Sequence, residues 1–160
     1  MNTKVSFTLN GKAIEVDVPP TTNLLRLLRD VLDVTSVKYG CEEGNCGACA
    51  VQIDGQPTNS CLVLAPTIEG RCVTTLEGIG TMDKPHALQK AFYEYYAAQC
   101  GFCTPGMLMA AKGLLDHNLN PTRDDVVNAI AGNVCRCTGY EKIIEAIQAA
   151  AKEMREQTGG

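Results

Sequence analysis

Hydrophobic and polar residues alternate along the first stretch of the chain, from Lys4 to Val18. The alternation breaks only at Asn10-Gly11, a dipeptide typical of the two-residue turn of a hairpin. This pattern predicts two antiparallel strands. A leucine-rich stretch at 24–32 then shows helical spacing after Thr22 or Asn23 as a capping residue, and we expect this helix to pack on the hairpin.

The remaining signals of the first half are shorter and are separated by glycine. They predict, in order, a loop at 40–47, a strand at 48–53, a turn at Asp54-Gly55 and a strand at 72–76. The first half is therefore expected to form a small mixed sheet that holds one helix.

The pattern changes after Leu76, where 77–85 lacks periodic apolar residues and suits a domain boundary. Four helical segments are predicted beyond it, at 86–98, 104–115, 122–131 and 138–155. The second is expected to use Thr104 as its cap, and the last two begin with capping-box patterns at Thr122 and Thr138. The sequence thus predicts an α+β protein, with one domain at 1–78 and a four-helix bundle at 79–160.

Composition narrows the function classes. The chain has 160 residues, 45% hydrophobic and 20% charged, as in ordinary globular proteins. A net charge of −4 gives no basic footprint for nucleic acid or acidic membranes. No apolar run approaches the ~20 residues that cross a bilayer, and the start lacks the apolar stretch of a secretion signal. We therefore expect a cytoplasmic protein with a protein or small-molecule partner.

Nine cysteines are the most informative feature of the composition. They are too few for the density of a secreted disulfide scaffold, and they occur in tight groups. Clustered thiols in a reducing compartment more often bind metal than pair as disulfides. The chain is therefore expected to bind metal.

The first group has the spacing Cys41-x4-Cys46-x2-Cys49, followed by Cys61. This is the plant-type ferredoxin spacing for a [2Fe-2S] cluster. Nearby glycines would let the backbone wrap the cluster closely enough to donate hydrogen bonds to sulfur. The alternative is a zinc knuckle, although structural zinc sites favour paired C-x2-C hooks.

The second group is Cys100-x2-Cys103 with Cys135-x-Cys137. Both pairs precede predicted helix N-termini, where the helix dipole would stabilise thiolates. A redox pair would need a βαβ context that this helical half lacks. The spacing alone leaves a second cluster and a zinc site open.

Three motifs together resemble the small iron–sulfur subunit of the xanthine oxidase family of molybdenum hydroxylases. They are CEEGNCGAC at 41–49, QCGFCTPG at 99–106 and GNVCRCTGY at 132–140. The resemblance covers nearly the whole chain. It implies one [2Fe-2S] cluster in a plant-ferredoxin-like (β-grasp) domain and a second in the four-helix domain, held by Cys100, Cys103, Cys135 and Cys137.

The resemblance also implies partners. The helical-domain cluster would lie near the molybdopterin of a large subunit, including its cytosine dinucleotide form, and the other cluster near the FAD of a medium subunit. By this resemblance, Gln99 and Cys137 would reach the pterin. From the sequence pattern alone, Gln99 is expected to be a surface amide at the C-terminal end of a helix. The complex is expected to be a dimer of heterotrimers.

Several other residues receive predictions from their context. Cys72 is expected to be a buried small hydrophobe in its strand. His86 and His117 are expected at helix ends on the surface. Arg136 could offset cluster charge or be an ordinary surface arginine, and Lys38 and Tyr39 could face a flavin-bearing partner.

No dinucleotide fingerprint, P-loop, catalytic triad or carboxylate pair is present in the sequence. We therefore expect no substrate site in this chain. The leading hypothesis is an electron-transfer subunit of an oxidoreductase that relays single electrons between molybdopterin and FAD. The chain ends about twenty residues beyond Cys137, which favours separate partner subunits. The alternatives are a free-standing ferredoxin-type carrier and a zinc-stabilised interaction protein.

Overall fold

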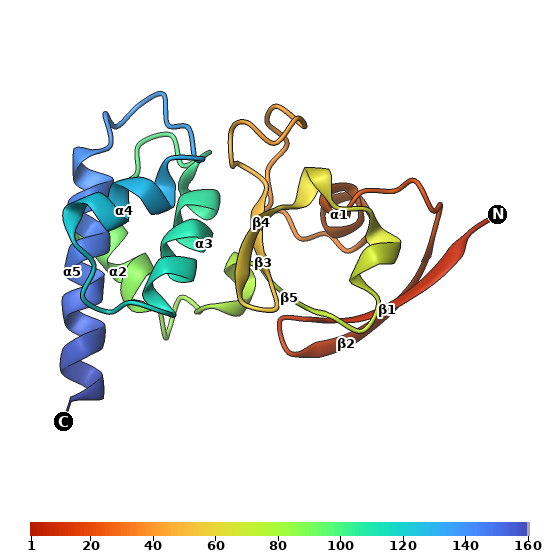
Figure 1. The fold of residues 1–160 in the computed structure, drawn as a ribbon, viewed down its shortest axis with the longest axis horizontal. Helices are drawn as coiled ribbons and strands as arrows, with labels where there is room; N and C mark the ends of the chain where they lie inside the picture. The colour runs from red at the N-terminus through yellow and green to blue at the C-terminus, as the bar shows by residue number, and fades with distance from the viewer. Residues whose placement is uncertain (160) are drawn as a thin grey trace.

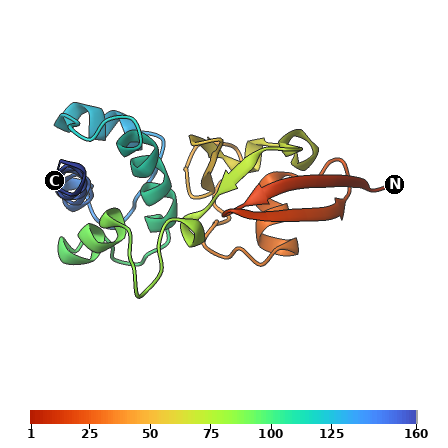
Figure 2. The same ribbon diagram turned by 90° about the horizontal axis from the view of Figure 1, so that it is seen from below.

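The structure is a computed structural model that describes residues 1–159. It has a sheet half and a helical half, which lie side by side and are joined by the segment 76–86 (Figures 1 and 2). Each half has its own buried apolar core, the first drawn from residues between Val5 and Val73 and the second from residues between Leu88 and Ala151.

The first half is built on a mixed five-stranded sheet with the order β2-β1-β5-β3-β4. Its strands are β1 (Thr3–Leu9), β2 (Lys12–Val18), β3 (Ala50–Ile53), β4 (Gln56–Asn59) and β5 (Cys72–Thr74). Strands β1 and β5 pair in parallel, and the other pairs are antiparallel. The predicted hairpin is confirmed: Asn10 and Gly11 both have positive φ, 50° and 79°, as a type I′ turn requires.

Strand β4 was not predicted from the sequence. It contains Pro57 and polar residues, and it is partly exposed, so it gives no alternating signal. The sheet order explains why a proline is accepted there, since β4 is an edge strand and need not donate every ladder hydrogen bond. The turn that leads into it, at Asp54-Gly55, is confirmed.

The predicted first helix is also confirmed. It begins as α1 (Leu24–Arg26) and continues as a π-helical turn, η1 (Leu27–Val31). The Asn23 side chain caps it by accepting a hydrogen bond from the Arg26 amide at 2.9 Å. Its leucines are buried in the same core as the inward side chains of β1, so the helix closes one face of the sheet.

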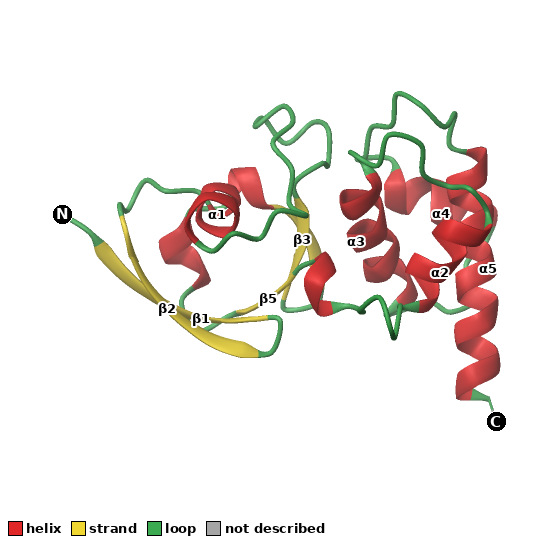
Figure 3. Ribbon diagram, turned by 180° about the vertical axis from the view of Figure 1, so that it is seen from behind, coloured by secondary structure: helices red, strands yellow, loops and turns green. Residues whose placement is uncertain are grey.

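The second half contains four helices, which Figure 3 shows packed around one another beside the sheet. They are α2 (Ala87–Glu94), α3 (Thr104–Leu115), α4 (Arg123–Ile130) and α5 (Glu141–Thr158). The capping box of Thr122 and Asp125 at the start of α4 is confirmed. None of the helices described within residues 1–159 is long and apolar enough to cross a membrane.

Three predicted helix limits are wrong. Helix α2 ends at Glu94 rather than near Ala98. Thr104 is the first helical residue of α3, and Cys103 takes the capping position. Helix α5 begins at Glu141, because the Thr138 hydroxyl does not cap it but donates to the sulfur of Cys135 at 3.1 Å.

The two halves meet where α3 packs against β3 and β4. Gly113 faces Pro57 so closely that a Cβ at Gly113 would clash with the proline ring. The buried Gln52 donates a hydrogen bond from Nε2 to Oδ2 of Asp116 at 2.9 Å. This contact fixes the side of the sheet half from which the helical half approaches.

Candidate metal centres

The first cysteine group is assembled by the β3–β4 hairpin. Cys49 directly precedes β3, and Cys61 lies in a short turn, η2 (Ser60–Leu62), directly after β4. The hairpin register pairs the neighbouring residues Ala50 and Asn59, and the Ser60 hydroxyl donates to the Cys49 carbonyl at 2.8 Å. The edge strand that the sequence did not reveal is therefore the element that brings Cys61 to the group.

The other two members of this group lie in the loop before β3, whose backbone points amides at sulfur. The Cys41 amide donates to Sγ of Cys46 at 3.3 Å, and the amides of Glu43 and Asn45 donate to Sγ of Cys41 at 3.3 and 3.2 Å. The Glu43 amide is the main reason that the pKa of Cys41 falls to about 7. A Cβ at Gly40 would lie 2.5 Å from the Cys46 sulfur, so only glycine allows this close wrap.

Burial acts in the opposite direction on the deeper thiols. Cys61 is buried, and this burial, together with the neighbouring Cys49 and Cys41 side chains, raises the pKa of its thiol to about 11. A thiol must lose its proton to bind a metal, so a bound cation would supply the charge that stabilises this thiolate. The donor set, with amides aimed at sulfur and thiols close to one another, fits a metal centre with thiolate ligands.

The second cysteine group gathers where two loops meet near the N-terminus of α3. Cys103 and Cys135 are half-buried, whereas Cys100 and Cys137 are exposed. Burial and the adjacent Cys135 side chain raise the pKa of Cys103 to about 12. The pKa of Cys137 is also raised, mainly by its hydrogen bond with the Cys100 thiol. The structure thus brings together all four residues that the sequence predicted for this group.

The arrangement also bears on what these thiols could hold. Within residues 1–159, no set of three or more His, Cys, Asp or Glu side chains is placed to hold a single metal ion. A structural zinc site needs four ligands that converge on one point, whereas a two-iron cluster shares its four thiolates between two irons.

The loops that carry the two cysteine groups are joined directly. The Val134 amide donates to the carbonyl of Cys46 at 2.9 Å, and Val134 is followed by Cys135. Nδ2 of Asn133, a buried side chain, donates to the Gly47 carbonyl at 3.0 Å. Figures 1 and 3 show these loops along the same edge of the molecule. We call these two hydrogen bonds the inter-loop joint.

Asn133 lies inside the GNVCRCTGY motif at 132–140, but the sequence did not indicate a role for it. A polar residue beside a cysteine motif was visible in the sequence, but its burial was not. We expect Asn133→Ala to lower the free energy of unfolding by about 1–2 kcal/mol, because it removes a buried hydrogen bond and leaves a small void. Urea unfolding measures this loss.

Asn128→Ala is the matched control for this prediction. Asn128 is exposed on α4, and its side chain makes no hydrogen bond with the described residues. Its replacement should leave the stability unchanged or slightly raised, since alanine favours helix. Equal losses in the two variants would show that the joint contributes nothing specific.

The remaining predicted residues have different outcomes. Cys72 was expected to be buried, but it is exposed on β5, a short strand on which only the next residue, Val73, points into the core. His117 is exposed, as predicted, whereas His86 is half-buried because its Nδ1 accepts from the Leu88 amide as the cap of α2. Gln99 is exposed and lies in the turn before α3, five residues beyond the end of α2.

Two further residues flank the cysteine loops. Arg136 is exposed and makes no salt bridge within the described chain. Tyr39 donates its hydroxyl to Asp30, and its ring lies under the guanidinium groups of Arg26 and Arg29, 5.8 and 5.6 Å from the ring centre. Its ring is thus occupied by contacts within the chain.

Comparison with known proteins matches both halves. A family model described as "2Fe-2S iron-sulfur cluster binding domain" matches residues 7–75, and one described as "[2Fe-2S] binding domain" matches residues 75–148. The chain is 46% identical to the nicotinate dehydrogenase small FeS subunit of Eubacterium barkeri, over 92% of this chain and 94% of that protein. It is 45% identical to the caffeine dehydrogenase subunit gamma of a Pseudomonas species, over 92% and 90%.

Solved structures agree with these matches. Quinoline 2-oxidoreductase from Pseudomonas putida contains a chain with a TM-score of 0.92 and 46% identity, with 97% of both chains covered. Aldehyde oxidoreductase from Desulfovibrio desulfuricans gives a TM-score of 0.94 and 44% identity over 96% of this chain, which corresponds to only 17% of that longer chain.

Proposed function

The chain belongs to the small iron–sulfur subunits of the xanthine oxidase family of molybdenum hydroxylases, and on this basis we propose that its eight grouped cysteines hold two [2Fe-2S] clusters. One would be held by Cys41, Cys46, Cys49 and Cys61, and the other by Cys100, Cys103, Cys135 and Cys137. The observation that carries this proposal is the pairing of thiols from separate segments, Cys49 with Cys61, Cys103 with Cys135 and Cys100 with Cys137. Backbone amides are also aimed at the sulfurs of the first set.

We divide the chain accordingly into a ferredoxin-like domain at 1–78 and a helical domain at 79–160, the latter a four-helix bundle. The separate apolar cores on either side of the 76–86 segment support this division. We also propose a cytoplasmic location, since a reducing environment keeps grouped thiols free to bind metal.

The clusters would supply one-electron carriers when bound. The residues of the chain hold and shield them: amides near Cys41 donate to its sulfur, Thr138 donates to the sulfur of Cys135, and burial covers Cys49 and Cys61. The inter-loop joint fixes the separation of the two cysteine groups through one main-chain contact between Cys46 and Val134. The chain is thereby suited to pass single electrons from one group to the other.

Four relatives are named as subunits of dehydrogenases or of a hydroxylase, two of them as small subunits, which supports larger partner subunits for this chain. We propose that a large molybdopterin-binding subunit meets the helical domain and that a medium FAD-binding subunit meets the ferredoxin-like domain, in a dimer of heterotrimers. Gln99 and Cys137 are both exposed, as contact with a pterin held by another chain requires. The substrate would bind in the large subunit.

Metal analysis of the protein purified from its native source tests this function. Two clusters predict about four irons and four acid-labile sulfides per chain, negligible zinc, and two distinguishable paramagnetic resonance signals after dithionite reduction. Copurification of molybdenum-binding and FAD-binding subunits would support the role of this chain as the electron-transfer subunit between them. Two irons with one zinc would contradict the second cluster, and a loaded protein that stays monomeric without partners would favour the free-standing carrier.

A further inference from the structure

An unusual residue, Tyr96, follows the end of helix α2. Its last turn closes with the pair of hydrogen bonds of a Schellman motif, from the Ala97 amide to the Phe92 carbonyl and from the Tyr96 amide to the Tyr93 carbonyl. Tyr96 therefore occupies the position that glycine usually takes, and its φ is +55°. A tyrosine in this left-handed conformation carries a steric cost that glycine would avoid.

Nothing within the described chain offsets this cost. The Tyr96 side chain is 82% exposed, and its hydroxyl makes no hydrogen bond to residues 1–159. The other tyrosine with positive φ, Tyr140, is half-buried and its hydroxyl accepts from the Cys135 amide at 2.8 Å. The positive φ of Tyr140 is thus explained by a hydrogen bond of its side chain, whereas no contact within the described chain explains the positive φ of Tyr96.

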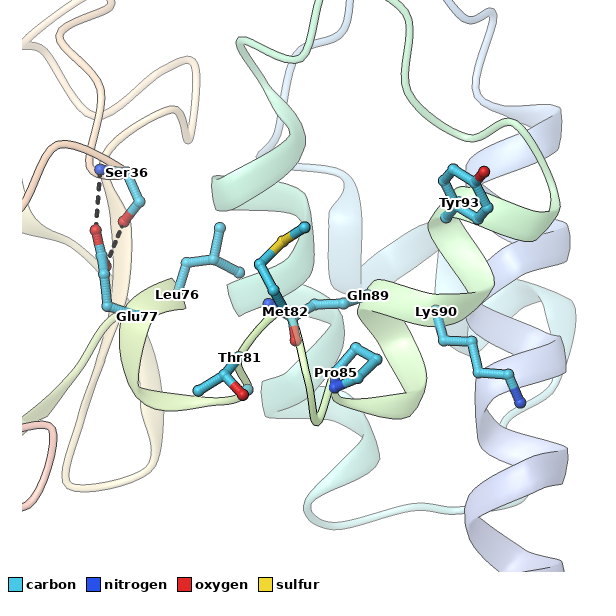
Figure 4. A pocket seen from close by; sticks show the side chains of 10 residues that line it. Ser36, Leu76, Glu77, Thr81, Met82, Pro85, Gln89, Lys90 and Tyr93 are labelled. Atoms are coloured by element: carbon cyan, nitrogen blue, oxygen red, sulfur yellow. Dashed lines mark hydrogen bonds between the residues drawn. The ribbon is translucent and has the colours of Figure 1, made fainter.

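Tyr96 is part of a larger apolar surface. Tyr93, one turn earlier, is 85% exposed and lines a hollow together with Tyr96. On its other side Tyr93 borders a second groove of about 760 Å³, between α2 and the segment that joins the two halves, where Met82 is 98% exposed (Figure 4). We call Met82, Tyr93 and Tyr96 the tyrosine face.

The position of this face indicates which partner covers it. Tyr96 is three residues from Gln99 and four from Cys100, so it lies within about 10–14 Å of the exposed residues at the second cysteine group. A stable interface covers about 800 Å² on each partner, a patch wider than that distance. A subunit that brings its cofactor to Gln99 through an interface of this size would therefore reach Tyr96 as well.

We propose that Tyr93 and Tyr96 anchor the molybdopterin-binding large subunit, with the groove beside Tyr93 receiving an apolar segment of that subunit. This inference rests on the proposed function, because it takes the second cysteine group as the end that faces the pterin. Tyrosine is well suited to the role, since it buries a large ring with little loss of side-chain freedom and is enriched at the energetic centres of interfaces. The cost of the backbone strain at Tyr96 would then be offset in the assembled complex, where its ring is buried against the large subunit.

Tyr96→Gly gives a test in which folding and assembly should change in opposite directions. Glycine relieves the backbone, so the melting midpoint of the cluster-loaded chain should stay the same or rise by about 2–4 °C. The intact complex, purified through a tag on the large subunit and diluted stepwise on a sizing column, should dissociate at a concentration at least tenfold higher. Tyr93→Gln, which keeps a good helix former, should weaken assembly by a similar factor.

Val31→Ser is the control, because Val31 is 54% exposed on the sheet half and lies outside the tyrosine face. It should leave the dissociation of the large subunit unchanged. If Tyr96→Gly and Tyr93→Gln complexes dissociate like the wild type, the inference is wrong while the proposed function stands. Selective loss of the FAD subunit would also overturn it. If the wild-type chain never copurifies with a molybdenum subunit, the proposed function itself fails.

Discussion

Replacing Cys103 with serine should halve the iron and sulfide content of the chain, from about four of each to about two. Cys103 is half-buried at the start of α3, between Cys100 and Cys135, so the second group cannot close around a metal centre without it. A serine hydroxyl is a poor substitute for a soft thiolate ligand of iron. The first group is held by the β3–β4 hairpin and should keep its cluster, so one of the two paramagnetic resonance signals should remain.

The matched variants define this result. Cys49→Ser should remove the other signal and spare the one lost in Cys103→Ser. Cys72→Ser, at the exposed ninth cysteine, should keep the full iron and sulfide content. Full metal content in Cys103→Ser, or loss of iron in Cys72→Ser, would contradict the assignment of ligands.

Gly106→Ala should produce the largest loss of stability, about 3 kcal/mol in the free energy of unfolding. Gly106 lies in the first turn of α3 directly against the Gly47 carbonyl, with which an added Cβ would clash, and it also lies close to Nδ2 of Asn133. The added Cβ would clash with a main-chain carbonyl and is itself fixed to the main chain of α3, so the strain cannot be relieved by turning a flexible side chain. The higher helix propensity of alanine, worth about 1 kcal/mol, is too small to compensate.

Gly132→Ala provides the control for this prediction. Gly132 directly precedes Asn133, yet a Cβ there would meet no atom within 4 Å, and its φ lies outside the left-handed region. We expect a change of less than about 0.5 kcal/mol for this variant. Urea unfolding of the cluster-loaded chain measures both. A stabilised Gly106→Ala variant would show that the first cysteine loop is not held against the start of α3.

Local signals in the sequence predicted much of the fold correctly. The hairpin turn at Asn10-Gly11, the Asn23 cap and the capping box at Thr122 are each formed by residues within a few positions of one another. Such interactions depend on the backbone geometry of one turn, which residue type strongly restricts. The spacing of the cysteines is likewise local within each motif.

The failures are mostly non-local. The edge strand β4 takes its place only through pairing with β3, and its own residues carry no β pattern. The burial of Asn133 depends on a partner 86 residues earlier in the chain. Thr138 was expected to cap a helix, but its hydroxyl bonds to the sulfur of Cys135 instead, so a nearby acceptor outweighed the helix signal. The exposure of Cys72 follows from which side of β5 faces the core.

The hydrogen bond between Val134 and Cys46 uses only main-chain atoms, and this has a consequence for how the protein can change over time. An amide and a carbonyl are present whatever side chains the two positions carry, so substitutions at exposed neighbours such as Arg136 or Asn45 can accumulate without moving the loops apart. The neighbouring contact between Gly106 and the Gly47 carbonyl does not tolerate substitution in this way, because a Cβ at Gly106 would clash. We therefore expect outward-facing side chains at this edge to vary, whereas no side-chain atom can be added between the Gly47 carbonyl and Gly106.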